Sequence, residues 1–145
     1  MFAHILVHVV DEMVNAKNMR MIATLLAEAG ARATLLYISD PRAPYVYTTK
    51  VADYKKADER HEQVCNAHAK AVLEKAAQLI GGEVTIKTLH EYSTEVYEGI
   101  IEAAKKVKAN AILMASHKRT GLKKVFMGSD TYAVIANSKL PVIVI

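Results

Sequence analysis

The C-terminal part of this sequence restricts the possible folds more than any other part. Residues 111–115 (Ala-Ile-Leu-Met-Ala) form a short apolar run without the 3.6-residue period of a helix, which is typical of a parallel strand buried on both faces. A basic loop follows and ends at Gly128, where a short helical pattern begins with Ser129 or Asp130 as the expected N-cap. Residues 140–145 (Leu-Pro-Val-Ile-Val-Ile) form a further apolar strand. This order of strand, loop, helix and strand predicts a parallel α/β sheet.

The end of this loop is a candidate site for a phosphate group. A helix N-terminus presents unpaired backbone N–H groups and the positive end of the helix dipole. Gly128 allows close approach of the backbone, and the Ser129 hydroxyl adds a further hydrogen-bonding group. Basic side chains gather nearby, at positions 105, 106, 108, 118, 119, 123 and 124. They indicate either solvated helix ends and loops or an attraction for an anion such as a nucleotide phosphate.

The rest of the sequence alternates apolar runs with amphipathic stretches. Strands are expected over residues 3–10, 32–39 and 83–90, and helices over residues 13–29 and 56–80 and after Ser93 or Thr94. Residues 40–55 form the longest irregular segment, either a functional loop or a cover over the sheet edge. With 145 residues in total, the pattern predicts one α/β domain over residues 1–145, with helices on both faces of a five-stranded parallel sheet.

Several functional classes are not supported by the sequence. No apolar stretch approaches the roughly 18 residues of a membrane helix, the first residues lack a basic signal-peptide region, and Cys65 is the single cysteine, so we expect a cytoplasmic protein without a membrane partner. No nucleic-acid recognition motif and no nucleophile or phosphate-loop motif of an enzyme is present, so we expect no nucleic-acid partner and no catalytic residues. His61, Cys65 and His68 share one helix face, which suits a metal or, as we favour, a core or interface.

The C-terminal part resembles the universal stress protein family. After its fourth strand that family has a Gly-x2-Gly-x9-Gly-Ser/Thr frame, and its chain usually ends in a Pro-Val-hydrophobic strand. Here the frame keeps its length, with Ala115 and Lys118 at the first two glycines and Gly128-Ser129 at the last pair, and residues 141–145 read Pro-Val-Ile-Val-Ile. The resemblance covers the whole chain. It implies a Rossmann-like, adenine-nucleotide α-hydrolase-like fold with strand order 3-2-1-4-5.

The resemblance also implies a nucleotide site in the crevice between the first and fourth strands, where the strand order reverses. ATP or AMP would bind there. The residues expected to contact it are Val9, Val10, Asp11, Ile38, Met114, Ala115, Lys118, Gly128, Ser129 and Asp130. The phosphates would lie between Lys118 and the Gly128-Ser129 turn, and the base against Val10 and Ile38.

Some of these residues admit a second interpretation. The family aspartate position holds Val10, and the acid comes one residue later at Asp11, which reaches a ribose hydroxyl or adenine amine or else caps a helix. Ile38 contacts adenine or belongs to the core. Lys118 supplies charge to the phosphates or obstructs them, and a left-handed backbone there would cost about 1–3 kcal/mol. The Asp130 side chain is expected to point outward, because it would repel a phosphate.

Together these observations predict a dimeric stress-response module that binds a nucleotide and signals. The homodimer would form through residues 140–145, an apolar edge strand that would otherwise promote aggregation. Two alternatives stay open: a nucleotide-free member that acts through protein–protein contacts, and a weak ATPase.

Overall fold

A five-stranded parallel sheet forms the centre of the chain. The computed structural model describes residues 2–43, 51–118, 125–126 and 128–145, and for residues 51–53, 117–118 and 125–126 it describes the backbone alone. The sheet order is β3-β2-β1-β4-β7, which confirms the predicted order 3-2-1-4-5. The strands are β1 (His4–His8), β2 (Arg32–Ser39), β3 (Ile86–Tyr92), β4 (Ala111–Met114) and β7 (Val142–Val144).

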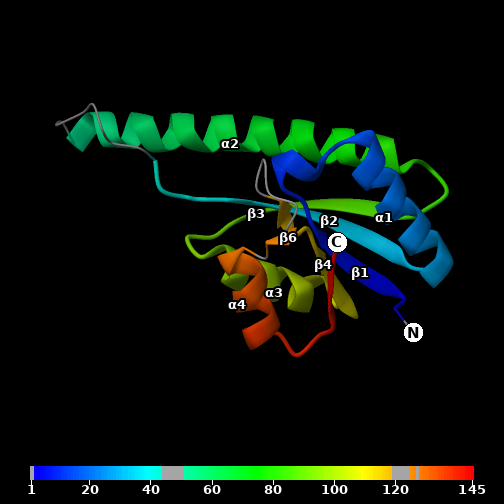
Figure 1. The fold of residues 1–145 in the computed structure, drawn as a ribbon. Helices are drawn as coiled ribbons and strands as arrows, with labels where there is room; N and C mark the ends of the chain where they lie inside the picture. Colours follow the sequence, from blue (N-terminus) through cyan, green and yellow to red (C-terminus); the bar gives the residue numbers. More distant parts are fainter. Residues whose placement is uncertain (1, 44–50, 119–124, 127) are drawn as a thin grey trace.

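Helices cover both faces of this sheet. The helices are α1 (Ala16–Ala29), α2 (Val51–Ile80), α3 (Val96–Val107) and α4 (Ser129–Asn137), with a short 3-10 helix η1 (Asp11–Met13) before α1. Figure 1 shows α1 and α2 over one face and α3 and α4 over the other. No helix in the described part of the chain is long and apolar enough to cross a membrane.

Two hydrophobic cores result from this layering. Along β1, Ile5 and Val7 point to the core under α1 and α2, whereas Leu6 points to the core under α3 and α4. All three side chains are fully buried. Successive residues of a strand face opposite sides of the sheet, so a strand covered on both sides needs an unbroken apolar run. The same reasoning applies to β4, and it explains why these two strands are visible in the sequence.

The helix ends differ from the prediction in instructive ways. Helix α1 begins at Ala16 because Asn15 caps it, with the Asn15 side chain accepting a hydrogen bond from the Asn18 backbone N–H. Gly30 ends α1 in the left-handed conformation, as expected. Neither Ser93 nor Thr94 is the N-cap of α3. That position is Glu95, and the Ser93 hydroxyl donates to the Glu95 carbonyl instead.

Three further features differ from the sequence-based prediction: two element boundaries and one additional strand pair. Helix α2 begins at Val51, five residues earlier than expected, and residues 44–50 lie outside the described part of the chain. Strand β3 covers Ile86–Tyr92 rather than residues 83–90, because its pairing with β2 runs up to Ser39. A small antiparallel pair, β5 (His117–Lys118) and β6 (Val125–Phe126), lies within the basic loop and was not predicted.

His4 is a buried titratable group at the start of β1. Its side chain is 6% exposed, and Nε2 lies 2.7 Å from the Thr34 hydroxyl. Burial lowers the pKa of His4, and the positive charges of Arg32 and Lys87 lower it further, against a smaller opposite effect of the Val107 carbonyl. The folded state therefore binds a proton at this position less readily than the unfolded state does.

We predict that His4 makes the stability of the fold depend on pH. Because its pKa is depressed in the folded state, the free energy of unfolding should fall as pH decreases from about 6.5, the ordinary histidine value, through the folded pKa. Urea unfolding at pH 7.5, 6.5 and 5.5 should show a smaller decrease for His4→Gln than for the wild-type protein. Equal decreases in both proteins would contradict the prediction.

Candidate functional site

The candidate site begins where β1 and β4 end. These two strands are parallel neighbours, with Val7 opposite Leu113, so the segments that follow them leave the same edge of the sheet. From β1 the sheet continues through β2 to β3, and from β4 it continues to β7. The order of strands therefore reverses between β1 and β4, and open parallel sheets bind ligands at such a point.

The segment after β1 contributes one buried and one half-buried valine. Val9 is 1% exposed, and its backbone N–H donates to the Leu36 carbonyl at 2.8 Å. Val10 is half-buried, packs against the core under α1 and α2, and is the N-cap of η1. Val10 therefore lies at the switch point between β1 and β4 with its side chain half-buried, whereas the side chain of Val9 belongs to the core.

Asp11 is held by two side chains that are distant in the sequence. One carboxylate oxygen accepts a hydrogen bond from the Tyr37 hydroxyl at 2.7 Å, and the other lies 2.6 Å from Nε2 of His68 on α2. The interpretation of Asp11 as a helix cap is wrong, because Val10 caps η1 and Asn15 caps α1. Asp11 instead joins η1 to β2 and α2.

The two hydrogen bonds control the ionisation of Asp11. Partial burial raises the pKa of its carboxyl, but the hydrogen bonds from Tyr37 and His68 and the charge of His68 together outweigh burial, so the pKa lies below its ordinary value. For Tyr37, burial and the hydrogen bond to Asp11 raise the pKa far above its ordinary value. At neutral pH the carboxylate is therefore a charged acceptor and the phenol a stable donor.

Ile38 follows Tyr37 on β2 and points to the opposite face of the sheet. It packs, half-buried, against the core under α3 and α4. A Cβ atom built on Gly99 of α3 would lie 3.0 Å from its Cδ1 atom, so α3 and the Ile38 side chain approach each other closely. This position matches the second interpretation of Ile38 as a core residue.

The segment after β4 is tied to the last strand. Met114 is buried, and its carbonyl accepts a hydrogen bond from the Ile145 N–H at 3.0 Å. The Ser116 N–H and hydroxyl donate to the Ile145 carbonyl at 2.7 and 2.6 Å. Ala115 between them is half-buried against the core under α1 and α2. The first glycine position of the family frame is therefore a packed alanine.

Lys118 pairs with Val125 in the β5–β6 ladder. A strand position is extended, and Lys108 is the one non-glycine residue with positive φ in the described part of the chain. The backbone strain that a left-handed lysine would cause at position 118 therefore does not arise. The basic residues Arg119, Lys123 and Lys124 lie outside the described residues.

Helix α4 begins without a side-chain cap. Its N-cap is Gly128, with φ −71° and ψ 164°, and not Ser129 or Asp130 as the sequence predicted. These angles are accessible to any residue, so what glycine contributes here is the missing side chain. Ser129 and Asp130 are exposed in the first turn, as the outward position expected for Asp130 requires. The N–H groups of this turn therefore have no side chain of the N-cap residue to which they could donate.

The histidine and cysteine side chains on one face of α2 make contacts within the chain. His61 Nε2 lies 2.7 Å from the Asp40 carbonyl oxygen, Cys65 Sγ lies 3.5 Å from the same nitrogen, and His68 contacts Asp11. No group of three or more metal-binding side chains occurs among the described residues. Asp40 itself is paired with Arg42, which lowers the pKa of the Asp40 carboxyl to about 2.

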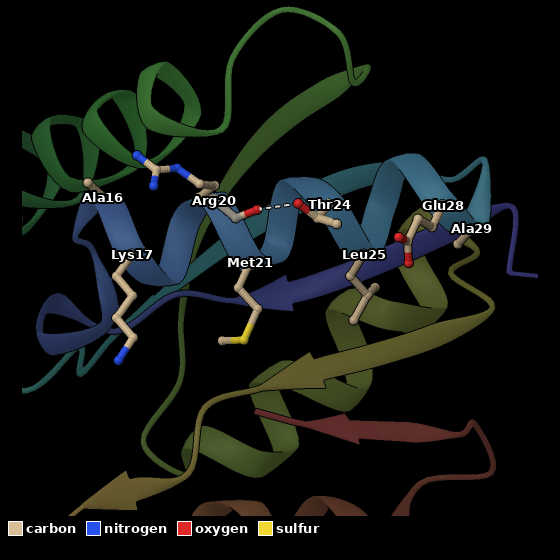
Figure 2. A pocket seen from close by; sticks show the side chains of 8 residues that line it. All are labelled: Ala16, Lys17, Arg20, Met21, Thr24, Leu25, Glu28 and Ala29. Atoms are coloured by element: carbon tan, nitrogen blue, oxygen red, sulfur yellow. Dashed lines mark hydrogen bonds between the residues drawn. The ribbon is translucent and has the colours of Figure 1, made fainter.

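A separate hollow lies along the outer side of α1. It has a volume of about 980 Å³, and its walls come from α1 alone: Ala16, Lys17, Arg20, Met21, Thr24, Leu25, Glu28 and Ala29. Figure 2 shows Lys17, Met21 and Leu25 pointing to the side of α1 on which β4 and β7 lie, while Arg20 points away from them. Met21 is 45% exposed. Half of the residues that line the hollow are apolar, namely Ala16, Met21, Leu25 and Ala29.

The strand order defines an α/β protein whose parallel sheet has its switch point between β1 and β4. A family model described as the universal stress protein family matches residues 1–145. The chain belongs to the universal stress protein family. A curated universal stress protein from Methanocaldococcus jannaschii is 40% identical over 57 residues, a stretch that covers 36% of this chain and about a third, 34%, of the relative.

Solved structures agree with this assignment. Universal stress protein UspA from Lactobacillus plantarum is 26% identical, with a TM-score of 0.73 over 99% of this chain and 97% of that chain. A universal stress protein from Archaeoglobus fulgidus in complex with dAMP is 20% identical, with a TM-score of 0.64 over 99% and 97%. A universal stress protein in complex with cAMP is 14% identical, with a TM-score of 0.61 over 99% and 96%. At these lower identities the likeness is one of fold.

We predict that Tyr37→Phe raises the pKa of Asp11. The substitution removes a hydrogen bond to the ionised carboxylate and keeps the aromatic ring, so the charged form loses stabilisation while packing is preserved. A pH titration of the Asp11 carboxyl by NMR measures the change. Tyr92→Phe is the matched control, because the Tyr92 hydroxyl donates to Asn66. An unchanged pKa in Tyr37→Phe would show that this hydrogen bond is absent in solution.

Proposed function

We propose that this universal stress protein binds an adenine nucleotide, ATP or AMP, in the crevice between β1 and β4 and acts as a stress-response signalling module. The observation that carries the proposal is the uncapped first turn of α4, which follows the family loop with its Gly128-Ser129 pair intact. Such a turn offers N–H groups and the positive end of a helix dipole to a phosphate. Two fold relatives were solved with adenine nucleotides, dAMP and cAMP, which supports the choice of ligand.

In this proposal the phosphates lie between Lys118 and the Gly128-Ser129 turn, and the base lies against Val10 and Ile38. The Lys118 backbone occupies an extended position, so lysine replaces the family glycine there without backbone strain. In the proposal its ammonium group contacts a phosphate. We propose binding without hydrolysis. The Asp11 carboxylate is already held by Tyr37 and His68, and no group of three or more metal-binding side chains occurs in the described part of the chain. A metal-assisted hydrolase would use several metal-binding carboxylates.

Calorimetry with ATP on three variants tests this proposal. Ser129→Ala should weaken binding by roughly 1.5–3 kcal/mol, about tenfold to a hundredfold, because one hydroxyl bond to a charged acceptor is lost. Gly128→Val should abolish binding, because a branched side chain blocks approach to the first turn of α4. Lys118→Gly should lower the affinity and weaken its salt dependence, because a cation is removed.

The outcomes separate the possible roles of the loop. A gain in affinity in Lys118→Gly would show that Lys118 obstructs the site. If neither the wild-type protein nor any variant produces heat or competes for ATP, the nucleotide proposal fails. A nucleotide-free member that acts through protein contacts would then be favoured, since Ala115 packs into the core where the family has its first glycine.

We also propose that the protein is a homodimer that pairs through β7. This strand forms one edge of the sheet, and no described strand pairs with its outer side. Pro141 and Ile145 direct their backbone groups inward to Ile112, Met114 and Ser116. Because backbone directions alternate along a strand, Val142 and Val144 direct theirs outward. An exposed apolar edge of this kind is a template for a second copy of itself.

The apolar surface of α1 extends this edge. Ile143 and Ile145 face the same side of the sheet as α1 and are half-buried. Met21 and Leu25 of α1 point to that side (Figure 2). An antiparallel pair of β7 strands would bring these four side chains of one protomer close to those of its partner. Edge hydrogen bonds and apolar burial would then act together in the interface.

We predict that Val144→Pro yields a monomer. Proline removes the outward N–H of residue 144, and the inward hydrogen bonds of Ile145 are unaffected, so the fold is retained while the edge loses a donor. Lysine at both Val142 and Val144 should produce monomer or insoluble protein, because Val142 also packs on the core under α3 and α4. Light scattering at micromolar concentration measures the mass.

Val64→Lys is the matched control, since Val64 is 59% exposed on α2. It should leave the mass of the dimer unchanged. A wild-type monomer at micromolar concentration, or a Val144→Pro variant with the same mass as the wild-type dimer, would contradict pairing through β7.

A further inference from the structure

The hydrogen bonds to Asp11 suggest a role for two residues outside the expected nucleotide contacts. We propose that Tyr37 and His68 are positioning residues: they hold the Asp11 carboxylate so that it accepts a hydrogen bond from a donor group of the nucleotide, either a ribose hydroxyl or the adenine amine. This inference rests on the proposed nucleotide binding and assigns the part of the chain that orients the sugar and base.

The first argument is the geometry of the carboxylate. The Tyr37 hydroxyl donates to one Asp11 oxygen at 2.7 Å, and His68 Nε2 lies 2.6 Å from the other. Two donors on two different elements therefore fix the plane of the carboxylate. A carboxylate has about four acceptor positions, and these two bonds use one on each oxygen. The Asp11 side chain is 46% exposed. An oriented, ionised acceptor with free lone pairs therefore faces solvent beside the crevice.

The second argument is that both donors are themselves held in place. The Tyr37 and His68 rings make an edge-to-face contact, with centroids 5.8 Å apart at 72°, and Tyr37 also contacts the His90 ring at 6.1 Å. The centroid of the His90 ring in turn lies 4.8 Å from that of the Tyr92 ring, and His90 Nε2 lies 2.8 Å from the buried Ser39 hydroxyl oxygen. A continuous group of rings thus connects α2 to β2 and β3. A donor supported in this way orients its acceptor more precisely than a flexible surface side chain can.

The third argument is that the arrangement does not depend on the charge of His68. The neutral imidazole with its proton on Nε2 donates to Asp11, and so does the imidazolium. The other titratable groups near Tyr37 are His90, whose pKa is lowered mainly by burial, and Glu12 and Cys65, both of which act to keep the Tyr37 phenol protonated. The two donors therefore remain donors across the neutral range.

The experiment measures the affinity of AMP, dAMP, 3′-deoxyadenosine monophosphate and inosine monophosphate by calorimetry. The ligand dAMP lacks the 2′-hydroxyl, 3′-deoxyadenosine monophosphate lacks the 3′-hydroxyl, and inosine monophosphate carries a carbonyl where AMP has its amine. If Asp11 accepts from one of these groups, the wild-type protein should prefer AMP to the ligand that lacks it by roughly tenfold or more. The identity of the disfavoured ligand then shows whether Asp11 contacts the sugar or the base.

Variants of the two donors give the decisive comparison. Tyr37→Phe and His68→Ala should each reduce this preference several-fold, because Asp11 loses one of its two constraints. His68→Gln should restore it, since a glutamine amide nitrogen lies the same number of bonds from the backbone as histidine Nε2. His61→Gln is the matched control on the same helix, because His61 contacts the Asp40 carbonyl and not Asp11.

Three results would overturn the inference, and they differ from one another. Equal affinity of the wild-type protein for all four ligands would mean that Asp11 accepts no hydrogen bond from a ribose hydroxyl or from the adenine amine. If Tyr37→Phe and His68→Ala both prefer AMP to the disfavoured ligand as strongly as the wild-type protein does, Asp11 needs no positioning by these two residues. If the wild-type protein binds neither these ligands nor ATP, the proposed function itself fails, and the Asp11 titration then still reports whether the hydrogen bonds exist.

Discussion

The pairing of β1 with both β2 and β4 is the constraint on which the rest of the structure depends. β1 is the central strand of the sheet, and its side chains are buried on both faces. Burial on both faces requires apolar residues at odd and even positions alike, and it requires helices above and below. β2 and β4 lie on opposite sides of β1 in the sheet. The segments that follow these strands therefore diverge at the edge formed by the carboxyl ends of the strands. The crevice follows from the topology and not from any particular side chain.

The loop after β4 shows how a family frame can persist while its glycines change. Ala115 fits because that position is packed against the core, and Lys118 fits because it is an extended strand residue. Neither position requires the left-handed backbone that makes glycine necessary. Gly128 is different, since what matters there is the absence of a side chain at the N-terminus of α4. The three positions therefore have different structural requirements, although the family frame has glycine at all three.

Asp11 illustrates the limits of reasoning along the chain. From the sequence, its neighbours suggested a helix cap or a ligand contact, and His68 belonged to a possible metal face of another helix. The structure joins the two residues, which are separated by 57 positions, and adds Tyr37 from β2. A hydrogen bond between distant elements depends on helix α2 lying over the end of the sheet. No local pattern in the sequence encodes that position, so the pair could not be predicted.

What the sequence determined by itself was the class of fold, the order of elements, the cores and the frame of the loop after β4. These features depend on local periodicity and on apolar runs, which are properties of neighbouring residues. The ends of the elements shifted by a few residues where a side chain made an unexpected contact, as at Asn15 or Ser93. Tertiary structure alone decided that Ile38 enters a core, that Gly128 caps α4 and that Asp11 is held by Tyr37 and His68. Each of these features depends on how two elements pack against each other. That packing is determined by the burial of the apolar faces of helices and sheet, and not by the individual residues that come into contact as a result.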